Sequence, residues 1–165
     1  MAVSLEELSK ALVSLEEALT VEKTDISRDA SIQRFEFCVE LAWKSARKVM
    51  GTSTTAPKQV IREMAQSGLI EDVEFWLKSI DQRNLSSHTY IQKLAEEVYA
   101  FAKSFLNPAK QLLTKLQGLL NSDLQSSNIN TFRKPWKTGI FHTRWTLYKA
   151  RTLQNLTGRA LRGTK

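Results

Sequence analysis

The sequence predicts an all-α protein, an antiparallel up-and-down bundle of four or five helices. Through most of residues 1–120, apolar residues recur at steps of three and four, which is typical of helices with one buried face. No part of this region alternates apolar and polar residues as strands do. With 165 residues, the chain is long enough to bury a core in one domain.

The first two helices are predicted from their apolar stripes. In the first, the stripe consists of Leu5, Leu8, Leu12, Leu15 and Leu19. A longer helix from about Ser27 to Met50 has an apolar stripe of Phe35, Cys38, Ala42, Ala46 and Val49 and a polar stripe of Glu36, Glu40, Lys44 and Arg47. Its apolar face is widened by Phe37, Leu41 and Trp43. This width predicts that the second helix packs against more than one neighbour.

Capping and stop signals delimit the remaining helices. Thr54 or Thr55 precedes a short helix that begins near Pro57 and ends before Gly68. Asp72 is the predicted cap of a fourth helix, which buries Val73, Trp76, Leu77 and Ile80. The fifth helix has a stripe of Ile91, Leu94, Val98, Phe101 and Phe105. Pro108 interrupts this pattern, so the leucines from 112 to 120 form either a kinked continuation or a separate helix.

The charge distribution separates the bundle from the end of the chain. Nine of the 24 basic residues lie in residues 131–165, which contain no acidic residue, so residues 1–130 hold 15 basic and 17 acidic residues. We therefore predict a helical bundle over 1–120, a polar linker over 121–131 and a basic, aromatic tail over 132–165.

The tail interleaves its basic residues with Trp136, Phe141, Trp145 and Tyr148. Four interpretations remain open: stacking on single-stranded RNA, an amphipathic helix at a membrane surface, docking of the aromatic rings on the bundle, or an extension without a selected function.

Composition excludes several classes of site. The chain has one cysteine, Cys38, and two histidines, so it lacks zinc-site spacing, and it contains no glycine-rich phosphate loop. We expect no metal and no cofactor. The glutamate-containing N-terminus does not match a secretory signal, and no apolar run reaches spanning length. These features predict a soluble, cytoplasmic protein.

The stretch RNLSSHTY, residues 83–90, is the candidate functional site. On one regular helix, Arg83 and His88 diverge by roughly 140° and His88 and Tyr90 by roughly 160°. Either the helix breaks within residues 84–89, whose residues are poor helix formers, or two protomers share the site. An arginine, an imidazole and a phenol suffice for phosphodiester chemistry without a metal, with Arg83 binding the phosphate and His88 removing the proton of a 2′-hydroxyl.

A structural interpretation of the same residues is that Arg83 pairs with Asp81 or a nearby glutamate, His88 caps a helix end and Tyr90 packs its ring. The spacing of arginine and histidine alone favours this second interpretation, because such a match is common by chance.

Four segments change that balance because they carry a resemblance to a known family. They are RFEFCVELAWKSARKVM (34–50), PKQVIREMAQSGLI (57–70), DVEFWLKSIDQRNLSSHTY (72–90) and AEEVYAFAKSFLNPAKQLLTKL (95–116). In order and without large gaps, they resemble the nucleotidyltransferase substrate-binding proteins of the HEPN superfamily over about residues 1–120. The superfamily motif, Arg, four to six residues, His, any residue and Tyr, is present as Arg83, His88 and Tyr90.

The resemblance implies a homodimeric bundle with the motif in a cleft between protomers, and a toxin–antitoxin pair with a minimal nucleotidyltransferase. It implies a metal-independent ribonuclease with Arg83 and His88 as catalytic residues, Asn84 in substrate or nucleotide binding, and Tyr90 as the site of AMPylation by the partner. An alternative is a non-catalytic subunit that binds a nucleotide or substrate for that enzyme. A third hypothesis is a degenerate helical dimer that only scaffolds its partner.

Overall fold

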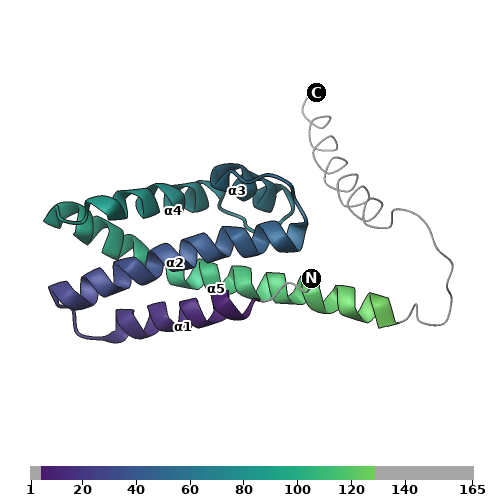
Figure 1. The fold of residues 1–165 in the computed structure, drawn as a ribbon, viewed down its shortest axis with the longest axis horizontal. Coiled ribbons are helices and arrows are strands. Elements are labelled where there is room, and N and C mark those ends of the chain that lie inside the picture. Colours follow the sequence, from purple (N-terminus) through teal and green to yellow (C-terminus); the bar gives the residue numbers. More distant parts are fainter. Residues whose placement is uncertain (1–4, 129–165) are drawn as a thin grey trace, which may run out of the picture. The chain divides into compact units, whose positions relative to one another are not determined.

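The fold is known from a computed structural model, which describes the backbone of residues 5–128 and the side chains of residues 5–122. The predicted tail from 132 to 165 lies outside the described residues. Within them, five α-helices and one short 3-10 turn form an antiparallel up-and-down bundle (Figure 1). The elements are α1 (Glu6–Thr20), α2 (Asp25–Met50), α3 (Pro57–Gln66), α4 (Val73–Leu85), η1 (Ser86–His88) and α5 (Gln92–Asn128). The predicted fold class is therefore confirmed.

Local signals set most helix boundaries as predicted, but the predicted Thr54 or Thr55 cap of α3 is wrong. Its cap position is Ala56, which has no side-chain cap, and Pro57 begins the helix. Helix α2 begins two residues earlier than expected because Thr24 and Ser27 form a reciprocal capping box. Asp72 caps α4 by accepting a hydrogen bond from the backbone N–H of Phe75 at 2.9 Å. At the end of α2, Gly51 has a φ of 65°, a left-handed conformation that favours glycine.

The core is centred on aromatic rings contributed by three helices. Phe35 of α2 is fully buried and meets Phe105 of α5 edge to face at 5.2 Å between ring centroids. Trp76 of α4 meets the same Phe105 at 5.3 Å. The leucine stripe of α1, with Leu8, Leu12 and Leu15 buried, completes the core. Helix α2 contacts α1, α3 and α4, as the prediction of several neighbours requires.

Two predicted core residues are on the surface. Phe37 of α2 is 55% exposed and Ile91, just before α5, is 43% exposed. Phe37 directly precedes Cys38, which is fully buried. Because successive helical residues point about 100° apart, the side chain of Phe37 points away from the core. Ile91 lies in the turn before α5 rather than on its buried face.

Helix α5 extends further than predicted. It continues through Pro108 as one helix, so the alternative of a separate helix after Asn107 is wrong. Buried residues on both sides of the proline, Phe105 and Leu112, hold the two halves in one core. The helix extends to Asn128, which makes the first part of the predicted 121–131 linker helical. In the described part of the chain, no helix is long and apolar enough to cross a membrane.

Candidate functional site

Helix α4 ends inside the RNLSSHTY stretch and gives way to the 3-10 turn η1. Short polar side chains donate hydrogen bonds to backbone carbonyl groups at the end of the helix and in the turn. They do so through hydrogen bonds from Ser86 Oγ to Arg83 O at 2.5 Å, Ser87 Oγ to Asn84 O at 2.9 Å and Thr89 Oγ1 to Ser86 O at 3.0 Å. Serine and threonine compete with backbone pairing in this way, which ends the regular helix. Of the two arrangements considered from the sequence, a break in the helix is therefore present within the protomer.

The guanidinium of Arg83 lies between its sequence neighbour and helix α2. Its Nη2 atom is 3.6 Å from Oε2 of Glu40, and its Nη1 atom donates to Oδ1 of Asn84 at 3.4 Å. The Arg83 side chain is 44% exposed. Part of the guanidinium therefore remains open to a ligand from solvent.

Glu40 is fixed by residues of its own helix. Trp43 Nε1 donates to Glu40 Oε2 at 3.1 Å, and Lys44 Nζ lies 2.7 Å from Oε1. Partial burial opposes the charged form of Glu40, but the hydrogen bonds from Lys44 and Trp43 and the charges of Lys44 and Arg83 outweigh it and lower the pKa of this carboxyl. Glu40 is consequently an anion beside Arg83 at neutral pH.

A second carboxylate of α2 contacts the turn itself. Glu36, one helical turn before Glu40, contacts the hydroxyl of the buried Ser86, whose one proton is shared between Glu36 and the carbonyl oxygen of Arg83. Residues four apart lie on one face of a helix, so Glu36 and Glu40 form a short acidic edge along the motif. Glu36 thus joins η1 to α2, and Glu40 joins the last turn of α4 to the same helix.

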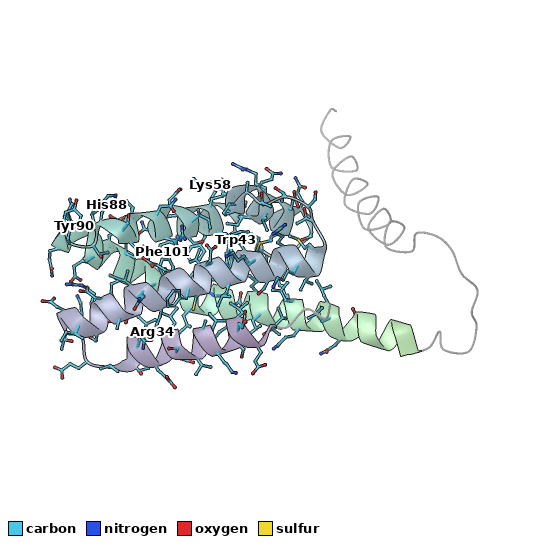
Figure 2. The ribbon with its side chains drawn as sticks, in the orientation of Figure 1. Arg34, Trp43, Lys58, His88, Tyr90 and Phe101 are labelled. Carbon is cyan, nitrogen blue, oxygen red and sulfur yellow. The ribbon has the colours of Figure 1, made fainter. Side chains whose placement is uncertain are left out.

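His88 and Tyr90 lie together at the end of the bundle where α4 meets α5 (Figure 2). Their ring centroids are 6.1 Å apart at an interplanar angle of 72°, an edge-to-face arrangement. Tyr90 is 82% exposed, so its ring is not packed into the core. The side chain of Tyr90 is therefore open to solvent.

The two candidate catalytic residues make separate contacts in this protomer. Among the described residues, Arg83 makes its polar contacts with Glu40 and Asn84, whereas His88 contacts Tyr90. The structural interpretation is correct for Arg83 in that a glutamate pairs with it. Asp81 instead pairs with Lys58 at 2.7 Å. The Tyr90 ring packs only edge to face against His88 and not into the core, and the suggestion that His88 caps a helix end stays a prediction.

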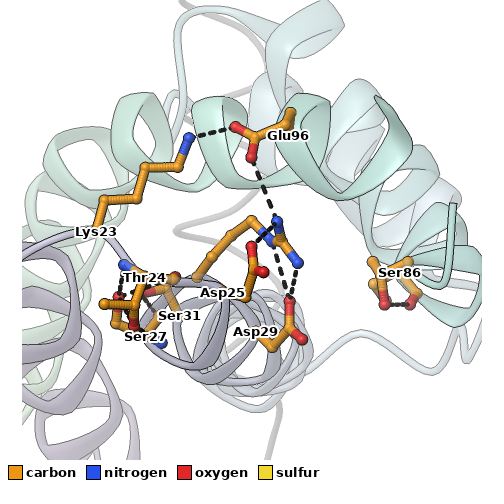
Figure 3. Close-up of polar contacts among 10 residues, drawn as sticks. Lys23, Thr24, Asp25, Ser27, Asp29, Ser31, Ser86 and Glu96 are labelled. Carbon is orange, nitrogen blue, oxygen red and sulfur yellow. Dashed lines mark hydrogen bonds and ion pairs between the residues drawn. The ribbon is translucent and has the colours of Figure 1, made fainter. Parts of the chain in front are cut away.

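A buried arginine anchors the start of α5 at the same end of the bundle (Figure 3). Arg28 is 4% exposed, and its guanidinium lies 2.8 Å from Asp25, 2.9 Å from Asp29 and 3.4 Å from Glu96. Lys23 pairs with the same Glu96. Because Glu96 belongs to the first turns of α5, these ion pairs hold that helix against α2 just after the His88–Tyr90 turn.

The sequence did not predict the roles of Glu36, Glu40 and Arg28. The polar stripe of α2 contains both glutamates, but it is also the pattern of a solvated face. In the part of the chain that the structure describes, no group of three potential metal ligands is present.

Comparison with known proteins places this fold in a family. Residues 3–118 match the model of the family described as "Nucleotidyltransferase substrate binding protein like". The chain belongs to this family. The resemblance predicted from the sequence is thereby confirmed at that level.

A relative with a ribonuclease name matches part of the chain. A Haemophilus influenzae protein named probable ribonuclease HepT is 35% identical over 95 residues, which are 53% of this chain and 65% of that protein. The match thus spans slightly less than two thirds of the relative's length.

Two solved structures share the fold. One, from Thermus thermophilus, has a TM-score of 0.63 and 33% identity, covering 66% of this chain and 98% of that one. The other, from Haemophilus influenzae, has a TM-score of 0.60 and 30% identity, covering 69% of this chain and 99% of that one. This second structure is described as revealing the fold of a substrate binding domain of a nucleotidyltransferase.

Proposed function

We propose that this protein is a HEPN-type toxin, a metal-independent ribonuclease in which Arg83 and His88 act on the phosphodiester bond. The observation that carries the proposal is the broken end of α4. Arg83 in the last turn of α4, His88 in η1 and Tyr90 two residues later are all exposed there. The relative named probable ribonuclease HepT supports the same activity.

The chemistry assigns one role to each side chain. Arg83 binds the phosphate through the open part of its guanidinium and offsets negative charge in the transition state. His88 accepts the proton of the 2′-hydroxyl as the 2′-oxygen bonds to phosphorus. The bond from phosphorus to the 5′-oxygen breaks, and the protonated imidazole returns a proton to that oxygen. The products are a 2′,3′-cyclic phosphate and a 5′-hydroxyl. Asn84, which holds Nη1 of Arg83, helps to bind the substrate or nucleotide.

Neutralisation by a minimal nucleotidyltransferase fits the position of Tyr90. Transfer of AMP forms a bond between the phenolic oxygen and the α-phosphorus of ATP, releases pyrophosphate and frees the phenolic proton. The product places a bulky anion beside His88, since the two rings are 6.1 Å apart. Such a group repels and sterically excludes an RNA phosphate.

The second copy expected in a homodimer also has a candidate contact. Phe37 is 55% exposed on α2, next to Glu36 of the acidic edge. An exposed aromatic ring on the helix that contacts the motif supports a dimer interface on that helix. Light scattering of the purified protein and of a Phe37→Asp variant tests this, with a dimer expected for the first and a weakened dimer for the second.

The ribonuclease proposal is tested by expressing the protein alone in cells, beside Arg83→Ala and His88→Ala variants, and following growth and total RNA. We expect growth arrest and RNA loss with the wild-type protein and neither with the variants at equal soluble expression. An unmutated protein that folds but neither arrests growth nor cleaves RNA contradicts the proposal.

A non-catalytic subunit that binds a nucleotide or substrate for the nucleotidyltransferase is the alternative. The descriptions of the family and of the solved Haemophilus influenzae structure favour it. A binding role tolerates His88→Gln, which keeps a polar side chain, whereas catalysis does not. Nucleotide binding by both the wild-type protein and this variant, without RNA cleavage by either, supports the alternative.

A further inference from the structure

The contact between Arg83 and Glu40 joins the motif to helix α2 through a loose ion pair. The separation of 3.6 Å between Nη2 and Oε2 exceeds the roughly 2.7–2.9 Å of a charge-assisted hydrogen bond. Both side chains are partly open to water, at 44% exposed for Arg83 and 31% for Glu40. A ligand anion that meets the guanidinium with better geometry is able to replace the carboxylate.

The two partners differ in how firmly they are held. The carboxylate of Glu40 is fixed by the Trp43 indole and by Lys44, both on α2. Arg83 has only Asn84 as a further polar partner among the described residues, at 3.4 Å. When a phosphate binds, the long arginine side chain therefore moves, and the anionic carboxylate stays beside the site.

We propose that Glu40 is an internal counter-ion of Arg83 that competes with the RNA phosphate for the guanidinium and so sets the affinity of the site. This inference rests on the proposed function, because it requires a phosphate to bind at Arg83. A guanidinium binds phosphate through two parallel N–H groups. Glu40 occupies the side of Nη2, so the phosphate has to displace the carboxylate or share this donor with it.

Binding of an RNA that resists cleavage separates this effect from catalysis. A short 2′-O-methyl oligoribonucleotide lacks the attacking hydroxyl, and its binding is measured for the wild-type protein, Glu40→Gln, Arg83→Gln and the double variant in turn. We expect Glu40→Gln to bind about two to five times more tightly, the range of a partly exposed ion pair. We expect no such gain when Arg83 is already glutamine.

Asp81→Asn is the matched control. Asp81 is on α4, two residues before Arg83, and pairs with Lys58 at 2.7 Å, so the substitution removes the same charge without touching Arg83. A gain in Glu40→Gln that exceeds the gain in Asp81→Asn supports the proposal. Equal gains, or weaker binding by Glu40→Gln, overturn it while leaving the ribonuclease assignment intact.

Two further measurements keep the test decisive. If Arg83→Gln binds the oligonucleotide as tightly as the wild-type protein does, phosphate binding at Arg83 is wrong, and the Glu40 proposal is overturned with it. Circular dichroism checks that Glu40→Gln is folded. If it melts well below the wild-type protein, Glu40→Asp replaces it. The shorter side chain withdraws the carboxylate from Arg83 but keeps its charge, so a smaller gain in the same direction is expected.

Discussion

The rings of His88 and Tyr90 meet edge to face, with centroids 6.1 Å apart. Tyr90 is 82% exposed. The candidate base and the candidate acceptor of AMP are thus neighbours. The contact is between the two rings, so it does not require the phenolic oxygen. This relationship separates catalysis from its control in the proposed toxin.

Tyr90→Phe is expected to remain toxic and to escape neutralisation. Phenylalanine keeps the ring that meets His88 but lacks the oxygen that accepts AMP. Growth of cells that co-express the partner nucleotidyltransferase, together with the intact mass of the purified protein, measures both effects. Rescue of the Tyr90→Phe protein by the partner at wild-type level contradicts the assignment of Tyr90.

The acid dependence of stability reports on Glu40. Its pKa is lowered in the folded state, so the folded protein binds fewer protons here than the unfolded chain does. The stabilisation that this carboxylate gives the folded state is fully present above about pH 4.3, the ordinary pKa of glutamate. It is lost as the pH falls through the lower pKa of the folded state. Urea unfolding between neutral and acid pH is expected to show the wild-type advantage over Glu40→Gln shrinking at low pH. A difference independent of pH contradicts the lowered pKa.

Cys38 is expected to be unreactive in the folded protein. Burial raises the pKa of its thiol to about 12, because the thiolate is poorly solvated inside the core. Alkylation at pH 8, followed by mass spectrometry, is expected to be slow in buffer and rapid in denaturant. Because the pKa of the thiol is raised in the folded state, the linked stabilisation is fully present below the unfolded pKa of about 8.5. This stabilisation is lost as the pH rises toward 12.

Arg28→Met is expected to destabilise the protein by about 1–2 kcal/mol. The substitution keeps much of the buried volume but leaves Asp25, Asp29 and Glu96 without their shared cation. The loss is smaller than for a fully buried ion pair because Asp25 and Asp29 are largely exposed. Denaturant unfolding measures it.

Lys10→Met provides the comparison for Arg28. Lys10 forms an exposed ion pair with Glu6 on α1, with side chains 75% and 68% exposed. Such pairs contribute only a few tenths of a kcal/mol. Equal losses in the two variants indicate that burial gives Arg28 no special role.

The elements of the bundle follow from local sequence because their signals are local. Asp72, Pro57 and Gly51 act on backbone groups within a few residues, and the stripes at three- and four-residue steps select one buried face for each helix. The sequence did not decide whether α4 ends within residues 84–89. The cause of that end, a run of short polar side chains, is nevertheless also local. These features were predictable for the same reason.

The sequence by itself determined the helical class, the Asp72 cap and the Arg83–His88–Tyr90 motif, since each depends on residues close together in the chain. Only the tertiary structure decided that α5 passes through Pro108, that Phe37 and Ile91 face outward, and that Arg83 meets Glu40. These outcomes depend on which helix faces which. Glu40 and Arg83 are 43 positions apart in the sequence and meet only because α2 and α4 pack side by side.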